Sequence, residues 1–248
     1  MRLIAPTAAL FAGLAALLPG KAMAYPIIID IEAVVRDVSD VGGLLGGAIG
    51  AGSLITGLYA YESTAPDNND FPGVSDYWHS ASPYGITLNS GSYTFATDPD
   101  NVRFLVEIVN NHYSGYDNYV LHSYQNLDLP GGIEVNHISW QLDDPGMTAL
   151  SSDELPLEAP ILTDWLQPSP FALTITGGLP DPASAGMGYY PPGQDFFIRA
   201  DVTSATLRTG STEAPAPAVP EPGSLACMAL ALAGMAFGAI RGSKQDRV

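Results

Sequence analysis

Two short segments rich in carboxylate and amide side chains carry residue types that bind metal ions. Asp67 and Asp70 flank two asparagines, and Asp98 and Asp100 precede Asn101. Because Ca²⁺ takes about six to eight oxygen ligands at flexible spacing, these four aspartates are candidate calcium ligands. Neither segment completes an EF-hand loop. A second interpretation is that both segments form turns, since Asp and Asn side chains bond readily to nearby backbone N–H groups.

The sequence contains none of the motifs that predict a catalytic nucleophile, a nucleotide site or a zinc site. It has no G-x-S-x-G and no G-x-x-x-x-G-K segment, and its one cysteine, Cys227, lies in an apolar stretch. Four histidines are scattered along the chain without zinc-site spacing: His79, His112, His122 and His137. We therefore predict no catalytic residue and no cofactor other than the possible Ca²⁺.

Aromatic side chains are frequent in segments that we interpret as loops. Exposed rings stack on sugars, whereas buried rings pack in a core or pair across strands. Packing explains these residues without a ligand, and we favour it. The residues are Tyr77, Trp78, Tyr113, Tyr116, Tyr119, Tyr189 and Tyr190.

The middle of the chain is strongly acidic. Residues 25–218 hold 24 acidic and four basic residues, a net charge of −20, against −17 for the whole chain. A domain of this charge repels nucleic acid phosphates and offers them no basic patch. We therefore predict no nucleic acid partner and a well-solvated surface. A pair of carboxylates at glycosidase spacing is expected by chance among so many acidic residues and predicts nothing.

Between residues 25 and 210 the sequence shows the two-residue period of strands and almost no helical period. Expected strands cover 29–36, 54–61, 85–95 (a hairpin), 102–109, 116–124, 133–142, 171–176 and 196–207. Many short strands separated by Pro, Gly, Asn and Asp favour an antiparallel β-sandwich of jelly-roll or immunoglobulin-like type. We expect one mainly β domain over 25–210.

Residues 41–61 carry no charge and contain overlapping G-x-x-x-G patterns at Gly42, Gly46 and Gly50. A packed transmembrane span is one interpretation. The seven glycines of this segment lower its hydrophobicity. We therefore favour a glycine-rich loop that runs into a strand.

The first 24 residues have the composition of a secretory signal peptide. Arg2 precedes an apolar run over 3–18, and Ala22 and Ala24 form a small-residue cleavage site. The apolar run is shorter than the about 20 residues that span a bilayer. We expect export through the Sec translocon and removal of 1–24 by signal peptidase.

The other end combines a linker, an apolar span and a basic tip. Residues 211–222 are rich in Pro and Ala, which favours an extended linker. Residues 223–240 carry no charge and would reach about 27 Å as a helix, which predicts one transmembrane helix. The tip, 241–248, contains Arg241, Lys244 and Arg247. Basic residues beside a span stay in the cytoplasm, so the acidic domain would face outward.

Val219, Pro220, Glu221 and Pro222, followed by the apolar span and the basic tip, resemble the PEP-CTERM sorting signal. This resemblance implies an exosortase substrate of a Gram-negative bacterium that makes exopolysaccharide. It also implies an inner-membrane intermediate with a periplasmic domain, followed by release or attachment at the cell surface or in the extracellular matrix. A plain membrane anchor at the same span is the alternative.

These observations together predict an exported surface or biofilm-matrix protein with a non-enzymatic, structural or adhesive role. Its expected partners are the Sec translocon, signal peptidase, the exosortase, the inner membrane and exopolysaccharide. The alternative function is an extracellular carbohydrate-binding module or a carbohydrate-active enzyme.

Overall fold

The computed structural model describes residues 24–112, 115–166, 172–180 and 195–208, which form ten antiparallel strands. Within these ranges the one helical element is a 3₁₀ turn, η1 (Leu162–Asp164). The prediction of a mainly β domain is therefore confirmed. The strands are β1 (Pro26–Asp40), β2 (Leu54–Glu62), β3 (Val74–His79), β4 (Gly85–Ser90), β5 (Tyr93–Ala96), β6 (Phe104–His112), β7 (Tyr116–Ser123), β8 (Glu134–Asp144), β9 (Leu173–Gly178) and β10 (Phe196–Leu207).

All ten strands are hydrogen bonded in one continuous sheet, in the order β3-β6-β7-β8-β9-β10-β1-β2-β4-β5. The predicted sandwich, with two separate sheets of jelly-roll or immunoglobulin-like type, is not confirmed. The physical reason is the pairing of β9, which bonds to β8 on one side and to β10 on the other. This pairing joins the two halves that a sandwich would keep apart.

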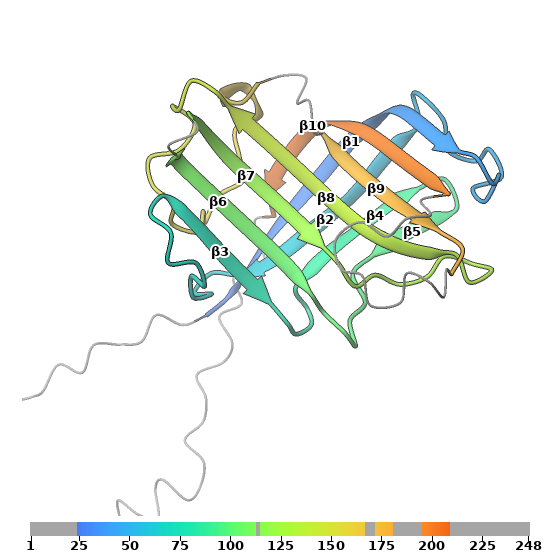
Figure 1. Ribbon diagram of the computed structural model, residues 1–248, viewed down its shortest axis with the longest axis horizontal. Helices are drawn as coiled ribbons and strands as arrows, with labels where there is room; N and C mark the ends of the chain where they lie inside the picture. The colour runs from blue at the N-terminus through green and yellow to red at the C-terminus, as the bar shows by residue number, and fades with distance from the viewer. Residues whose placement is uncertain (1–23, 113–114, 167–171, 181–194, 209–248) are drawn as a thin grey trace, which may run out of the picture.

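The sheet curls until its two halves face each other across one core, and β7 and β8 pass in front of β1 and β2 in Figure 1. Side chains from distant strands meet inside. The hydroxyl oxygens of Tyr59 on β2 and Tyr119 on β7 lie 2.9 Å apart. The ring of Phe95 on β5 lies 6.5 Å, centroid to centroid, from that of Phe196 on β10.

Strand alternation sorts the side chains between the core and the outer face, which is the sheet face turned away from the core. On β1, Ile29, Ile31, Ala33 and Val35 are all buried, as their spacing predicts. On β10, apolar and polar residues also alternate along the strand, and the apolar ones join the same core.

Residues 41–53 form a loop of turns between β1 and β2, so the loop interpretation of this glycine-rich segment is confirmed. The Asp40 carboxylate accepts hydrogen bonds from the backbone N–H groups of Leu44 and Leu45, at 2.8 and 3.0 Å. Leu45 and Ile49 then pack into the core. In the described ranges, no helix has the length and apolar character needed to cross a membrane.

The segment 145–166, between β8 and β9, packs over the core. The hydroxyl group of Tyr61 donates to the Pro156 carbonyl at 2.6 Å, and that of Tyr77 donates to the Asp153 carbonyl at 2.9 Å. Trp165, near the end of the segment, is buried in the same core. The two tyrosines thereby hold this cover against β2 and β3.

β3 is a strand that the sequence pattern does not predict, because two of its three buried positions hold the polar residues Ser75 and His79. Tyr77 and Trp78 therefore lie in a strand, which corrects their interpretation as loop residues. Tyr116 and Tyr119 lie in β7, as the expected strand 116–124 predicts and against their interpretation as loop residues. Tyr113, Tyr189 and Tyr190 lie outside the described residues. The predicted signal peptide, except Ala24, and the predicted linker, transmembrane helix and basic tip also lie outside them.

Candidate functional site

The four candidate calcium ligands lie in the connections before β3 and before β6. One carboxylate oxygen of Asp67 accepts hydrogen bonds from the backbone N–H groups of Asn69 and Asp76, each at 2.9 Å. An oxygen of Asp98 accepts one from the N–H of Asp100, at 3.0 Å. The bonds from Asn69 and Asp100 have the two-residue spacing of Asx turns, as the second interpretation of the two segments expects, whereas the bond from Asp76 ties Asp67 to β3.

No group of three or more His, Cys, Asp or Glu side chains suited to a metal ion is present in the described part of the chain. Asp67 and Asp70 are not joined there by a third acidic ligand, and neither are Asp98 and Asp100. Calcium binding at these four aspartates stays a prediction.

Two histidines that are far apart in the sequence come together on the outer face. Nδ1 of His122 on β7 lies 3.0 Å from Nε2 of His137 on β8, and the two rings are stacked. Burial lowers the pKa of His122 to about 3, with a smaller contribution from His137, and burial lowers the pKa of His137 to about 4. Both imidazoles are therefore neutral near pH 7, and the N–H of one ring donates a hydrogen bond to the bare nitrogen of the other.

These histidines belong to a row of rings that we call the aromatic platform: Trp78, Tyr124, His122 and His137, with Arg103 beside them. The Trp78 and Tyr124 rings are stacked with centroids 5.8 Å apart. Tyr124 in turn stacks on both histidines, at 5.5 and 5.1 Å. Three segments of chain thus contribute four rings to one surface.

The register of the strands explains why the rings meet. Trp78 on β3 pairs with Leu105 on β6, and Leu105 pairs with His122 on β7. Leu105 therefore lies between the two rings on the outer face, where it is only 4% exposed. Trp78 itself remains 36% exposed, so the platform has a packing role and still presents a ring to solvent.

Arg103 lies just before β6 and is held by two rings of the platform. Its guanidinium carbon lies 5.6 Å from the centroid of Trp78 and 5.2 Å from that of Tyr124, which are cation–π distances. The side chain is exposed. Among the described residues, Arg103 is the one basic side chain that forms no ion pair.

A pair of carboxylates lies on the outer face next to the platform. Asp76, two residues before Trp78 on β3, pairs directly with Glu107 on β6. Burial raises the pKa of Glu107, and the charge of Asp76 raises it further. One oxygen of Asp76 is buried without a hydrogen-bond partner among the described residues. The carboxylate oxygens of the pair are hydrogen-bond acceptors.

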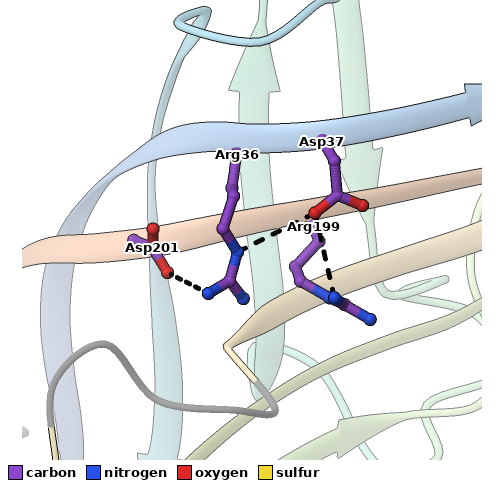
Figure 2. A network of polar contacts seen from close by, with 4 residues as sticks. All are labelled: Arg36, Asp37, Arg199 and Asp201. Carbon is purple, nitrogen blue, oxygen red and sulfur yellow. Dashed lines mark ion pairs between the residues drawn. The ribbon is translucent and has the colours of Figure 1, made fainter.

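The remaining arginines of β1 and β10 are used in a network of ion pairs, which Figure 2 shows from close by. Arg36 contacts Asp201 at 3.3 Å and Asp37 at 3.8 Å, and Arg199 contacts Asp37 at 3.8 Å. The register between the two strands shifts between Val35 and Asp37. These partly exposed pairs balance two positive and two negative charges, which fits a structural role.

The other titratable groups of interest are enclosed. Burial raises the pKa values of Tyr59, Tyr61 and Tyr119 and lowers that of His79. The Nε2 atom of His79 accepts a hydrogen bond from the N–H of Glu62, at 3.0 Å. A separate shallow depression of 260 Å³ near β4 and β5 has Tyr84 as its one titratable lining residue.

Residues 218–241 match the family model of the PEP-CTERM protein-sorting motif. The chain carries a PEP-CTERM motif. This motif implies a protein that is exported, processed by an exosortase and directed to the cell surface. Its span includes Val219, Pro220, Glu221, Pro222 and Arg241 of the predicted sorting signal, whereas Lys244 and Arg247 follow it.

The PEP-CTERM motif accounts for about one tenth of the chain, and the strands lie outside it. No curated protein matches the chain. No solved structure matches it. The role of the β domain is therefore argued from its own residues.

Sequence reasoning misses most of the aromatic platform. Its residues come from positions 78, 103, 122, 124 and 137, and no local pattern links them. Trp78 is the one residue of the aromatic platform that the sequence analysis names among the aromatic residues able to stack on sugars. The order of strands decides which of these residues share a surface, and that order is not predictable from local patterns.

Proposed function

We propose that this PEP-CTERM protein is a non-enzymatic, structural or adhesive component of the cell surface or the biofilm matrix. The observation that carries the proposal is the sorting motif at residues 218–241, attached to a folded acidic domain. The motif directs the protein to the cell surface, and the β domain is the part of the chain that remains outside the cell. The high negative charge keeps such a domain soluble among other surface components.

The route to the surface is also part of the proposal. Residues 1–24 direct export through the Sec translocon, and signal peptidase cleaves after Ala24. Residues 223–240 then hold the chain in the inner membrane with the domain in the periplasm. The exosortase removes the tail near Pro220 and Pro222.

The first experiment is the intact mass of the native protein in membrane, periplasmic and culture-matrix fractions. We expect a chain that starts at Tyr25 and ends near Pro222, outside the cell. The combined variant Pro220→Ala, Glu221→Ala and Pro222→Ala should keep its tail and stay in the membrane fraction. Pro215→Ala with Pro217→Ala is the matched control, because it changes the same linker and spares the motif. A native chain that extends to Val248 in the membrane would overturn the proposal.

The second candidate function is a carbohydrate-binding module, and the aromatic platform favours it. Exposed rings beside hydrogen-bonding side chains suit the apolar faces and the hydroxyl groups of sugars. A surface protein with such a module would adhere to polysaccharide without changing it. Glycan binding with no release of reducing ends separates this candidate from a hydrolase.

A carbohydrate-active enzyme is the remaining alternative, and Asp76 with Glu107 is the pair to test for it. A glycosidase needs one carboxylic acid and one carboxylate on either side of the scissile bond. Release of reducing ends that is abolished by Glu107→Gln and by Asp76→Asn would support the enzyme. Glycan binding that survives both substitutions, without any turnover, would support the adhesive role.

A further inference from the structure

Arg103 differs from the other three arginines of the domain, which all form ion pairs. Residues 25–218 contain 24 acidic and four basic residues, and Arg36, Arg199 and Arg208 each contact an aspartate. Arg103 is exposed and has no acidic partner among the described residues. An exposed guanidinium without an acidic partner among the described residues can bind an anionic group of a ligand.

The two rings hold Arg103 in a way that suits such a ligand. The faces of Trp78 and Tyr124 lie 5.6 and 5.2 Å from the guanidinium carbon. A cation–π contact fixes the position of a guanidinium without using its N–H groups as hydrogen-bond donors. The planar fork of N–H donors matches the two oxygens of a carboxylate.

We propose that the aromatic platform binds an acidic polysaccharide, with a uronate carboxylate on Arg103 and the adjoining sugar ring on Trp78. This inference deepens the carbohydrate-binding candidate above. Trp78 is 36% exposed, which leaves part of its ring for the C–H groups of a pyranose. Further along β3 and β6, Asp76 and Glu107 accept hydrogen bonds from the hydroxyl groups of the next sugar.

The net charge of the domain does not exclude an acidic ligand at this place. Interactions between exposed charges fade beyond the Debye length, which is about 8 Å at physiological ionic strength. The contact of a carboxylate with Arg103 is direct, and no acidic side chain of the described residues forms an ion pair with this arginine.

The shape of the surface distinguishes a glycan from an acidic peptide. The platform is a row of stacked rings, and a depression of 260 Å³ lies elsewhere, against β4 and β5. Flat aromatic surfaces suit flat sugar rings, whereas peptide anchors need pockets. An acidic peptide is therefore a competing outcome of the test.

The test measures binding of defined probes to the full-length protein in detergent micelles. The probes are oligomers of alginate, which is a polyuronate, dextran oligomers of matched length, and oligoglutamate of matched charge. The variants are Arg103→Ala, Arg103→Lys, Trp78→Ala and Trp78→Tyr. Arg208→Ala removes an equal charge from an ion pair with Asp30, and Phe71→Ala removes another exposed ring, so these two are the matched controls.

We expect alginate oligomers to bind more tightly than either other probe. Arg103→Ala and Trp78→Ala should each weaken that binding at least about tenfold, because a charge-assisted hydrogen bond or a stacked ring is lost. Arg103→Lys should lose part of the affinity because it keeps the charge without the planar fork. Trp78→Tyr should keep most of the binding, and it serves as the test if Trp78→Ala fails to fold. The two controls should change the affinity less than about twofold.

Several results would overturn the inference. They are equal binding of dextran or oligoglutamate, unchanged binding by Arg103→Ala, and no binding of alginate at millimolar concentration. The proposed delivery to the surface is tested separately, since Arg103→Ala leaves the sorting motif intact. A variant that reaches the matrix fraction and no longer binds alginate separates the site from the sorting route.

Discussion

The hydroxyl oxygens of Tyr59 and Tyr119 lie 2.9 Å apart in the core, although four other strands separate β2 from β7 in the sheet order. Both side chains are almost completely buried. The Trp140 ring contacts both tyrosines edge-on, with centroid distances of 5.9 and 6.0 Å. This contact joins the two halves of the curled sheet by a hydrogen bond inside an aromatic cluster.

A double-mutant cycle on this pair measures how strongly the two halves are coupled. Tyr59→Phe or Tyr119→Phe alone should lower the free energy of unfolding by about 1–3 kcal/mol, because one buried hydroxyl group loses its partner. The double variant should cost less than the sum, since both polar groups are removed. Urea unfolding followed by tryptophan fluorescence gives these values, with Tyr93→Phe as a partly exposed control. Strictly additive effects would show that the bond contributes nothing.

The His122–His137 pair predicts a dependence of stability on pH. Their pKa values in the folded protein, about 3 and about 4, lie below the ordinary value of 6.5. Between about pH 4 and 6.5 the unfolded chain therefore binds more protons than the folded one. The free energy of unfolding should therefore rise with pH across this window. As the pH falls through it, the stability that the two neutral histidines contribute is lost.

The variant with both His122→Gln and His137→Gln isolates this effect. The pKa of His79 is also lowered, whereas that of Glu107 is raised and acts in the opposite direction. The comparison is therefore between the slopes of the wild type and of the double variant, measured by urea unfolding at pH 5 and pH 7. We expect a smaller slope in the double variant. Equal slopes in the two proteins would contradict the prediction.

Asp117 should anchor the cover formed by 145–166. Its side chain is fully buried, and its two oxygens accept hydrogen bonds from the backbone N–H groups of Asn111 and Leu150, at 2.7 and 3.0 Å. Asp117→Asn replaces one acceptor with an NH₂ donor that faces an N–H group. We expect a loss of about 1–3 kcal/mol in the free energy of unfolding.

The loss should appear as faster amide hydrogen exchange in 145–166, because this segment loses its bond to β7. Asp70→Asn is the matched control, since Asp70 is exposed in the connection before β3. Unchanged exchange in the cover of the Asp117→Asn protein would show that other contacts hold it.

Gly57 is required by the close approach of β2 and β4. A Cβ at this position would overlap the Thr87 carbonyl oxygen and crowd the backbone of Leu88. Gly57→Ala should therefore lower the free energy of unfolding by about 1–3 kcal/mol or prevent folding. Gly50→Ala is the control, because a Cβ there meets no atom within 4 Å. Thermal unfolding compares the two variants, and equal midpoints would refute the prediction.

Local patterns explain which parts of the fold are predictable. The alternation of Ile29, Ile31, Ala33 and Val35 predicts a strand with one buried face, and the structure confirms it. The strand 196–207 is predicted with its observed bounds for the same reason. β3 is missed because its buried positions include the polar Ser75 and His79 while Trp78 faces outward, so its apolar residues do not alternate in the sequence. The single curled sheet is missed because pairings such as β9 with β10 join segments that no local pattern relates.

The same division holds for function. The sorting motif is contiguous, so its residues are recognisable in the amino-acid sequence alone, and the family model matches it at 218–241. The aromatic platform is assembled from separate segments. Arg103 stands out only because the other arginines of the described chain form ion pairs, and those pairs depend on the fold.

The sequence by itself determined the mainly β character, the acidic charge and the sorting motif, because these depend on composition and on residues that are neighbours along the chain. Tertiary structure decided the single curled sheet, the contact of Tyr59 with Tyr119, and the meeting of Trp78, Arg103 and Tyr124. The physical reason is that strand pairing and register are set by packing over the whole domain. Hydrogen bonds between distant strands choose which side chains share a face, and the period of a single strand does not contain that information.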